Sequence, residues 1–364
     1  MNKLSIGNLL AKVPIIQGGM AVGISKSGLA SAVANAGGIG VIATAGIAHL
    51  ADDLSSNFIE ANNRIFAEEI RKAKSLTRGI IGANIMSALS NYAALAKVAI
   101  KEGIDIIFSG AGLPLSLPSF LPEGNTSTKL VPIVSSAKAL MLIARRWISK
   151  FNYVPDAVVI EGPLAGGHLG FRKDNIFNEE YSLEKLVPDV LSQAKTLEDR
   201  YGKPVPVIPA GGIYTGADIH KFVKMGASGV QMATRFVATY ECDASNEIKN
   251  AYIKANKEDI IIIDSPVGMP GRAIHNHFLD DVASGRKKPF TCPYHCITTC
   301  DFKKTPYCIA NALCNATEGN ISEGFAFAGQ NVWRVDKIVH VSELIQSLND
   351  EYDEAEKNDL NNSR

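Results

Sequence analysis

A single histidine stands among glycines where an apolar run ends. The stretch is "DAVVIEGPLAGGHLGF", Asp156 to Phe171, in which Glu161 precedes His168 by seven residues. A neutral imidazole in such a loop can take a proton from a carbon acid or hydrogen-bond a substrate oxygen. Glu161 could orient the ring or bond to a cofactor. The alternative is that His168 only holds its own loop through ordinary hydrogen bonds.

A second chemical candidate is the amide of Asn84, which sits in "GANIM" at the end of another apolar segment. A buried amide must be hydrogen-bonded, and a flat heterocycle offers complementary donors and acceptors. The alternative is an amide that caps its own loop.

Turns follow several apolar segments, among them the glycine-rich "QGGM" from Gln17 and "AGGI" from Ala210, and also "ATRF" from Ala233. Glycine lets backbone amides approach a ligand closely. If the last two turns follow neighbouring strands of a barrel, their N–H groups form a phosphate cradle, to which Thr234 adds a hydroxyl. Arg235 would either add charge or brace the barrel. Tight turning without a ligand is the alternative.

Five of the six cysteines lie in "CPYHCITTCDFKKTPYCIANALC". A helix would place Cys292, Cys296 and Cys300 on one face, and Cys308 would complete a set of four. Thiolates at this density can hold an iron–sulfur cluster or zinc, although the spacing lacks the usual pair of cysteines two residues apart. The alternative is a helix whose reduced cysteines pack as small apolar residues.

The elements that must position these groups are short apolar runs with helical patterns between most of them. Eight strands are expected, at Pro14–Gln17, Gly40–Thr44, Gly82–Met86, Asp105–Ser109, Leu130–Ser135, Ala157–Glu161, Pro206–Ala210 and Gly229–Ala233. Most are apolar on both faces, which is typical of a parallel sheet covered by helices. Eight such units in about 240 residues predict a (β/α)8 TIM barrel, with a doubly wound open sheet as the alternative.

The alternation of apolar runs and helical patterns ends after Tyr240, and three parts of the chain are expected. Residues 1–240 form the barrel, 241–320 an added cysteine-rich subdomain or lid, and 321–364 a return segment that packs on the barrel. The last residues are polar and are expected to fray.

The bulk composition is that of a soluble globular protein, with 46% hydrophobic and 20% charged residues in a chain of 364. Lys+Arg and Asp+Glu balance at 37 each, which gives no sign of a nucleic-acid or membrane partner. The apolar run from Gly28 to Ile47 is rich in Gly and Ala and indicates a helix plus a strand rather than a membrane span. We see no signal peptide and expect a cytoplasmic protein with a small-molecule substrate, and leave a homodimer open.

Taken together, "PIIQGGM", "AGGIGVI", "GANIM", "EGPLAGGHLG", "PVIPAGGI" and "GVQMATRF" resemble the nitronate monooxygenase (2-nitropropane dioxygenase) family. This family is related to the flavin-dependent enoyl-acyl-carrier-protein reductases. The resemblance covers roughly residues 10 to 240 and returns at "AFAGQ", Ala326 to Gln330. The cysteine-rich segment lies outside the usual pattern.

The resemblance implies a (β/α)8 barrel that carries FMN, with His168 as the active-site histidine that serves as base in nitronate oxidation. It also implies a set of cofactor contacts: Gly18, Gly19, Met20, Asn84, Glu161, Gly166, Gly167, Gly211, Gly212, Ala233, Thr234 and, beside Gly329, Gln330.

Three functions follow from these observations. The first is FMN-dependent oxidation of alkyl nitronates with oxygen. The second keeps the fold but uses NADH or NADPH to reduce the flavin, which then reduces an enoyl thioester or a quinone. The third is a flavin- or phosphate-binding barrel without turnover.

Overall fold

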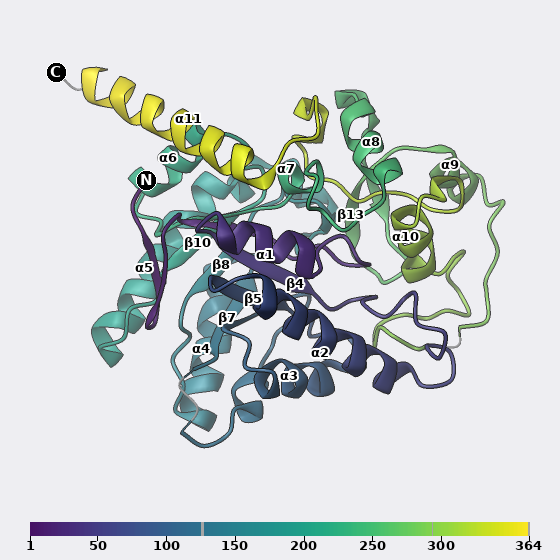
Figure 1. Cartoon of the computed structure of the whole chain (residues 1–364), viewed down its shortest axis with the longest axis horizontal. Helices are drawn as coiled ribbons and strands as arrows, with labels where there is room; N and C mark the ends of the chain where they lie inside the picture. The colour runs from purple at the N-terminus through teal and green to yellow at the C-terminus, as the bar shows by residue number, and fades with distance from the viewer. Residues whose placement is uncertain (125–126, 293, 363–364) are drawn as a thin grey trace.

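The computed structural model describes residues 1–124, 127–292 and 294–362. Eight parallel strands close into a barrel in the order β10-β11-β3-β4-β5-β6-β7-β8 (Figure 1). The strands are β3 (Ile15–Gln17), β4 (Ile39–Ala43), β5 (Ile80–Asn84), β6 (Ile106–Ser109), β7 (Lys129–Val134), β8 (Val158–Glu161), β10 (Val207–Ala210) and β11 (Val230–Met232).

The eight predicted strands and the TIM barrel are confirmed, and the doubly wound alternative is wrong. Each predicted segment contains or overlaps one barrel strand. An open sheet would leave two unpaired edges, whereas here β8 pairs with β10 and β11 pairs with β3, so the ring is complete. The apolar runs are buried on both faces because the strands have side chains inside the barrel and helices outside it.

Helices cover the outside of the barrel and continue into the C-terminal part. They are α1 (Ser27–Asn35), α2 (Phe58–Leu76), α3 (Tyr92–Lys101), α4 (Ala137–Phe151), α5 (Leu183–Tyr201), α6 (Gly216–Lys224), α7 (Thr234–Val237), α8 (Asn246–Lys254), α9 (His277–Ala283), α10 (Ile309–Thr317) and α11 (Val341–Asn362). Short 3-10 turns lie at Leu117–Phe120, Lys173–Asn175, Glu179–Tyr181, Lys257–Asp259, Ile321–Glu323 and Val332–Arg334. Thr215 caps α6, since its hydroxyl accepts from Asp218 N and the Asp218 carboxylate accepts from Thr215 N.

An N-terminal hairpin, missed from the sequence, belongs to the core inside the barrel. It consists of β1 (Leu4–Ile6) and β2 (Leu9–Ala11), paired antiparallel. Leu4, Ile6 and Ala11 are buried in one cluster with side chains from the barrel strands, such as Phe108 and Val159. Six residues of such short strands carry too little periodicity to be recognised.

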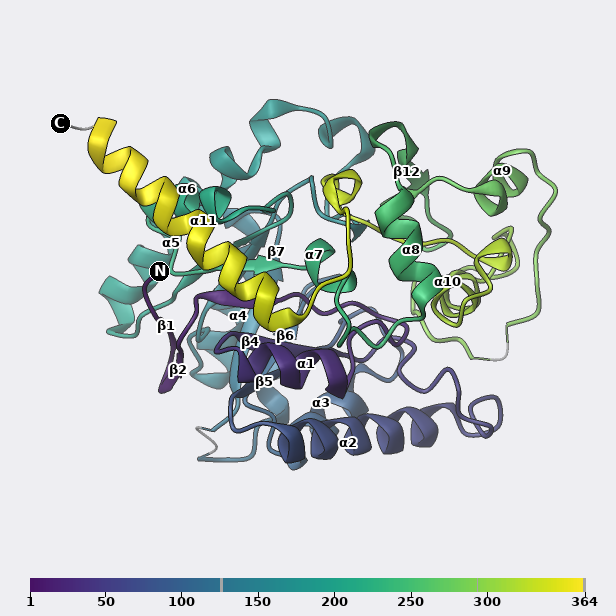
Figure 2. The same ribbon diagram turned by 45° about the horizontal axis from the view of Figure 1, so that its top comes forward.

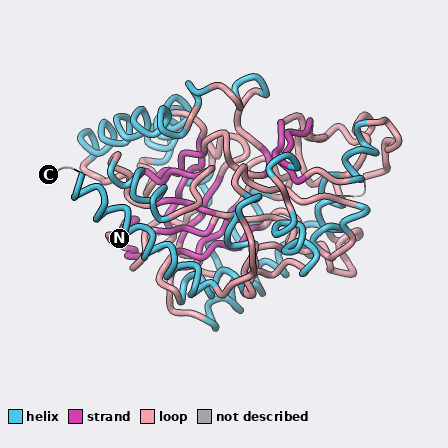
Figure 3. The backbone as a smooth tube through the Cα atoms, turned by 90° about the horizontal axis from the view of Figure 1, so that it is seen from above, coloured by secondary structure: helices cyan, strands magenta, loops and turns pink. Residues whose placement is uncertain are grey.

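A second sheet stands apart from the barrel (Figure 3). The strands β12 (Ile260–Asp264) and β13 (Pro270–Ile274) form a hairpin, and β9 (Gly167–His168) pairs with β13. The strand β13 is not apparent from the sequence, because it begins with Pro270 and Gly271, which are rare inside strands. Figure 2 shows α8, α9 and α10 grouped with this hairpin to one side of the barrel. The division at residues 240 and 320 stays a prediction.

The C-terminal end is ordered to a greater length than expected. The final helix α11 continues to Asn362 and packs along α6 (Figure 1). The polar residues were expected to fray, but Tyr352 is buried, Glu351 pairs with Arg235 at 3.2 Å, and Asp359 pairs with Lys224 at 2.7 Å. These contacts lie on one face of the helix, and they stabilise it over residues whose polar sequence predicts a solvated tail.

The described residues of the cysteine-rich stretch up to Cys308 are not helical, and α10 begins only at Ile309. The expectation of one helix face shared by Cys292, Cys296 and Cys300 is therefore wrong. Cys292 precedes a proline, which disfavours helical backbone, and the β-branched run from Ile297 to Thr299 does not favour it either.

Within residues 1–124, 127–292 and 294–362, no helix combines the length and apolar character needed to cross a bilayer. The run from Gly28 to Ile47 contains α1 and β4, as predicted.

A substitution at Gly40 tests the close contact between α1 and β4. A methyl group at Gly40 would lie 1.8 Å from the carbonyl oxygen of Ala30. We expect Gly40→Ala to lower the free energy of unfolding by about 3 kcal/mol or more, because backbone cannot move aside as a side chain can. Urea denaturation measures the change. Gly202→Ala is the control: Gly202 has a φ of +67° with no atom within 4 Å of the added methyl, so only backbone strain of about 1 kcal/mol is expected. Equal losses in the two variants would contradict the packing argument.

Candidate active site

A cavity of 760 Å³ opens at the carboxyl ends of the barrel strands. Its size is in the range of pockets that enclose cofactors and substrates. Twelve of the thirteen predicted site residues line it: Gly18, Gly19, Met20, Asn84, Glu161, Gly166, Gly167, His168, Gly211, Gly212, Ala233 and Thr234. The barrel brings them together because all of them follow or end a strand at the same rim.

Several polar side chains in this cavity have no hydrogen-bond partner in the described chain, and three of these belong to barrel strands. They are Asn84 at the end of β5, Glu161 at the end of β8 and Gln231 in β11. Other polar side chains at the barrel ends are paired, such as Gln17, whose Oε1 accepts from Val41 N at 2.9 Å. Partly buried amides and carboxyls without partners are costly, and a planar heterocycle with its own donors and acceptors would satisfy them.

Burial raises the pKa of Glu161 to about 7. The protein atoms around the carboxyl disfavour its charged form, although part of the residue faces the cavity. Near neutral pH a large share of Glu161 is therefore protonated and can donate a hydrogen bond to a ligand. Glu161 has no contact with His168, so the expectation that it orients the ring is not met; its second expected role, contact with a cofactor, stays open.

The turns after β10 and β11 hold a group of free backbone donors. In the described residues, the N–H groups of Gly212, Ile213, Ala233 and Thr234 donate to no protein acceptor. The φ angles of Gly211 and Gly212, +90° and +88°, make the turn that exposes them. Such a cluster of amides suits a phosphate group, so the residues present fit a phosphorylated flavin.

His168 is held in place by three contacts, all from the C-terminal part of the chain. Its Nε2 lies 2.7 Å from Ser265 Oγ, its backbone pairs with Gly271 of β13, and its ring meets the Phe327 ring edge-on at 5.0 Å. Burial lowers the pKa of His168 to about 4, so the ring is neutral at physiological pH. Within the described chain its Nδ1 has no partner, which leaves that nitrogen for a ligand.

Sequence reasoning missed these supporting residues, and it also missed Arg272. Arg272 is fully buried, and its Nη1 donates to the carbonyl oxygens of Pro163 and Ala165 at 2.5 and 2.7 Å. Its Nε and Nη2 have no partner in the described residues, and burial lowers its pKa only to about 10, so it stays charged. It ties β13 to the loop before His168. An arginine inside the apolar "GMPGRAI" was the available signal.

Gln330 is the exception among the predicted site residues, because its side chain does not line the cavity. Its backbone N–H donates to Leu164 O at 3.1 Å, and the neighbouring Gly329 lines the cavity instead. The side chain is displaced because backbone pairing sets the register of this segment. Of the two roles considered for Arg235, the structure shows the brace, since its guanidinium bonds to Tyr214 O and Glu351.

Cys296 and Cys314 line the far side of the cavity. All six cysteines are free thiols. In the part of the chain that the structure describes, no three side chains of His, Cys, Asp or Glu are grouped so as to hold a single metal ion.

A closed barrel, a cofactor-sized cavity at its carboxyl rim, free amides after the last two strands and a neutral histidine define a class. It is that of the (β/α)8-barrel enzymes that bind a phosphorylated cofactor. The nitronate monooxygenase family model matches residues 3–351, and the chain belongs to that family. The family is one of flavin-dependent oxidoreductases, which favours an enzyme over a binding barrel without turnover.

Individual relatives are distant. A probable nitronate monooxygenase of Staphylococcus saprophyticus is 26% identical over 75% of this chain and 78% of its own length. A (3aS,4S,5R,7aS)-5-hydroxy-7a-methyl-1-oxo-octahydro-1H-indene-4-carboxyl-CoA dehydrogenase of Mycobacterium tuberculosis is 26% identical over 75% of this chain. The match spans 66% of that dehydrogenase, just under two thirds.

Solved structures agree on the fold. FabK from Thermotoga maritima superposes with a TM-score of 0.72 at 26% identity, covering 96% of this chain and 95% of that one. Nitroalkane oxidase from Streptomyces ansochromogenes gives the same TM-score of 0.72 at 20% identity, over 95% of this chain and 97% of that one. The second comparison supports the fold alone.

The protonation of His168 can be tested in the flavin-free protein. We expect its ring to stay neutral until the pH falls to about 4, as followed by NMR of labelled histidines, with His168→Gln to assign the signal. Because the folded pKa lies below the unfolded value of about 6.5, the folded state binds fewer protons. His168 should therefore reduce stability as the pH falls from about 6.5 to about 4, by at most about 3 kcal/mol. Titration near 6.5 would contradict the buried, neutral ring.

Proposed function

We propose that the protein binds FMN at the barrel rim and oxidises small alkyl nitronates with oxygen. FMN would supply the electron transfer. The free amides of Gly212, Ile213, Ala233 and Thr234 would hold its phosphate, and Asn84, Glu161 and Gln231 would pair with the polar edges of its ring. The support is that each of these groups lies at the cavity and lacks a partner within the described chain.

His168 would bind the nitronate. Val267 N–H points to Ser265 Oγ at 3.4 Å, which leaves the hydroxyl hydrogen free to be donated to His168 Nε2. In that tautomer Nδ1 carries a proton and donates it in a hydrogen bond to a nitronate oxygen. A neutral imidazole can donate this hydrogen bond without adding a positive charge to the buried cavity. Because the nitronate is an anion, the hydrogen bond is charge-assisted and stronger than one between neutral groups. For a neutral nitroalkane the opposite tautomer is required, with Nε2 donating to Ser265 and Nδ1 accepting the α-proton.

This proposal rests on one observation. His168 is neutral, and its contacts with Ser265 and Phe327 hold its ring at the cavity. In FMN-loaded protein, an oxygen electrode should record nitronate-dependent uptake. His168→Ala should reduce kcat/KM by about 100-fold, the size of losing one donor to a developing or bound anion. Ser265→Ala should reduce kcat by about 10-fold with an unchanged FMN content, because it releases the ring without removing it.

Ser265→Thr is the matched control, because it keeps the hydroxyl and should recover most of the activity. Oxygen uptake that is unchanged in His168→Ala would remove the histidine from the reaction. No uptake by fully FMN-loaded wild type with any of several short nitronates would overturn the proposed substrate.

A second function is favoured by the shape of the cavity. Beyond the barrel rim it continues between the β4–α2 connection and α10, where Leu54, Phe58, Ile297 and Leu313 line it. An apolar extension of this kind suits a longer apolar substrate better than a short nitronate does. We propose as the alternative that NADH or NADPH reduces the flavin, which then reduces an enoyl thioester or a quinone. The similarity to FabK and to a carboxyl-CoA dehydrogenase supports it.

Anaerobic reduction separates the two functions. If the protein is a reductase, NADH or NADPH alone should bleach the flavin absorbance within the time of turnover in a stopped-flow spectrometer. If it is a nitronate oxidase, nicotinamides should bleach it slowly and nitronates rapidly. Photoreduced protein is the control, since it shows the full absorbance change that complete reduction produces.

A further inference from the structure

Arg272 is a buried cation for which the described chain supplies no anion. Its side chain is 1% exposed, and its Nη1 bonds to two carbonyl oxygens, those of Pro163 and Ala165. Its Nε and Nη2 have no partner in the described residues. By contrast, Arg235 in α7 is paired with Glu351 at 3.2 Å. A buried charge without a counter-charge is costly, so the position of Arg272 needs a reason beyond packing.

The two carbonyl groups that Arg272 holds belong to a loop that lines the cavity. Among the described residues every peptide bond is trans, and in a trans peptide the C=O and N–H groups point in opposite directions. The N–H groups of Leu164 and Gly166 therefore point away from the guanidinium. Neither of them donates to a protein acceptor in the described chain. Leu164 and Gly166 line the cavity, whereas Arg272 does not.

The same loop adjoins the free amides after β10 and β11, the phosphate cradle. A methyl group built on Gly329 would lie 2.6 Å from Thr234 Oγ1 and 3.8 Å from Gly166 N, so these two polar atoms border one small space. A methyl group built on Gly212 would lie 2.9 Å from Leu164 Cβ. The loop therefore packs against both turns of the cradle, and Gly166 N is a further free donor beside it.

The cavity lining itself offers a phosphate group no full positive charge at neutral pH from lysine or arginine. Neither residue type occurs among the described residues that line it, and its carboxylates, Glu161 and Glu318, would repel an anion when ionised. Arg272 lies on the other side of the loop, and the peptide units that it holds connect it to the cavity. In a chain of hydrogen bonds each bond polarises the next, so the guanidinium makes these N–H groups stronger donors to an anion.

We propose that Arg272 is a positioning residue for the phosphate group of the flavin. By holding the carbonyl groups of Pro163 and Ala165, it fixes the N–H groups of Leu164 and Gly166 as additional donors to the phosphate. It also supplies from behind the loop the positive charge that the cavity lining lacks. This role rests on the proposed FMN site, although Arg272 itself does not line the cavity.

Riboflavin, which lacks only the phosphate group of FMN, separates this role from a general structural one. Flavin is removed from the protein, and FMN or riboflavin is titrated back while the change in flavin fluorescence is recorded. Arg272→Met should weaken FMN binding about 30-fold, the loss expected for hydrogen bonds to a charged group, and riboflavin binding less than about threefold. A loop that merely lost its order would weaken the binding of both flavins alike.

Two further substitutions separate the charge of Arg272 from its hydrogen bonds. Both carbonyls bond to one nitrogen of Arg272, and a lysine ammonium also presents its donors from a single nitrogen. Arg272→Lys should therefore recover most of the FMN affinity. Arg272→Gln keeps an amide donor but no charge, and it should weaken FMN binding about tenfold. Riboflavin binding shows that a variant is folded, and Arg272→Gln replaces Arg272→Met in the comparison if the latter does not fold.

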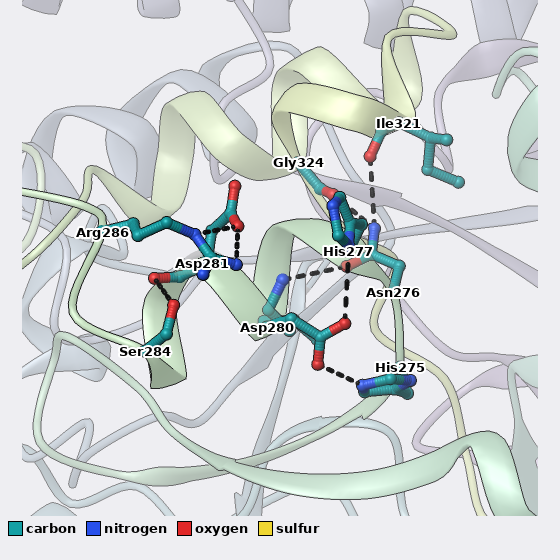
Figure 4. A network of polar contacts seen from close by, with 10 residues as sticks. His275, Asn276, His277, Asp280, Asp281, Ser284, Arg286, Ile321 and Gly324 are labelled. Atoms are coloured by element: carbon teal, nitrogen blue, oxygen red, sulfur yellow. Dashed lines mark hydrogen bonds and ion pairs between the residues drawn. The ribbon is translucent and has the colours of Figure 1, made fainter.

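Asn276 provides a control of matched geometry in the same C-terminal part of the chain. Figure 4 shows its side chain at the start of α9, where one nitrogen, Nδ2, donates to the carbonyl oxygens of Ile321 and Gly324. None of these three residues lines the cavity. Asn276→Ser keeps a hydroxyl that can cap α9 and removes both bonds. It should leave the ratio of FMN to riboflavin affinity at the wild-type value.

The titrations distinguish a failure of the cofactor site from a failure of Arg272. Wild-type protein that binds riboflavin as tightly as FMN would overturn the phosphate cradle and with it the proposed FMN site. Wild-type protein that prefers FMN, with the same preference in Arg272→Met and Arg272→Gln, would overturn the role of Arg272 alone. Equal weakening of both flavins in these variants would also overturn it, because Arg272 would then only hold the loop together.

Discussion

The hydrogen bond between His168 Nε2 and Ser265 Oγ joins parts of the chain that are 97 residues apart. Beside it, β9 pairs with β13, and Arg272 bonds to the carbonyl groups of the same loop. A glycine-rich loop has high conformational entropy, and alone it would not hold an imidazole in one orientation. The C-terminal hairpin supplies the missing restraint. The barrel therefore provides most of the cavity lining, and the added part of the chain fixes the position of the histidine.

This division explains why the candidate site residues on the barrel could be predicted from the sequence. Asn84, Glu161 and the glycines after β10 each follow an apolar strand directly, so a correct strand assignment places them at one rim. His168 was found for the same reason. Ser265 and Phe327 could not be found in this way, because their contacts to His168 depend on a hairpin register and a late bridge to Ala273 that no local pattern encodes. Gln330 failed for a related reason, since backbone pairing sets which side chain of "AFAGQ" faces the cavity.

The sequence-based predictions of the fold that were wrong had different physical causes. The N-terminal hairpin was too short to show a period, and β13 began with Pro270 and Gly271, which usually argue against a strand. The final helix is longer than its polar sequence predicts. The reason is that Glu351 and Asp359 form ion pairs with Arg235 and Lys224 on the barrel instead of being solvated. The cysteine stretch was read with the helical period although a proline follows Cys292. Only the final helix is a case in which tertiary partners outweigh local preference.

The same C-terminal part carries both the restraint on His168 and the cysteine-rich segment, and shared packing connects the two. Phe327 contacts the His168 ring and also the Phe325 ring, at 5.0 and 5.2 Å. Phe325 belongs to the apolar cluster that Cys300 and Tyr307 pack against. A rearrangement of the cysteine segment would thus reach the histidine through two aromatic contacts, without any change in the barrel.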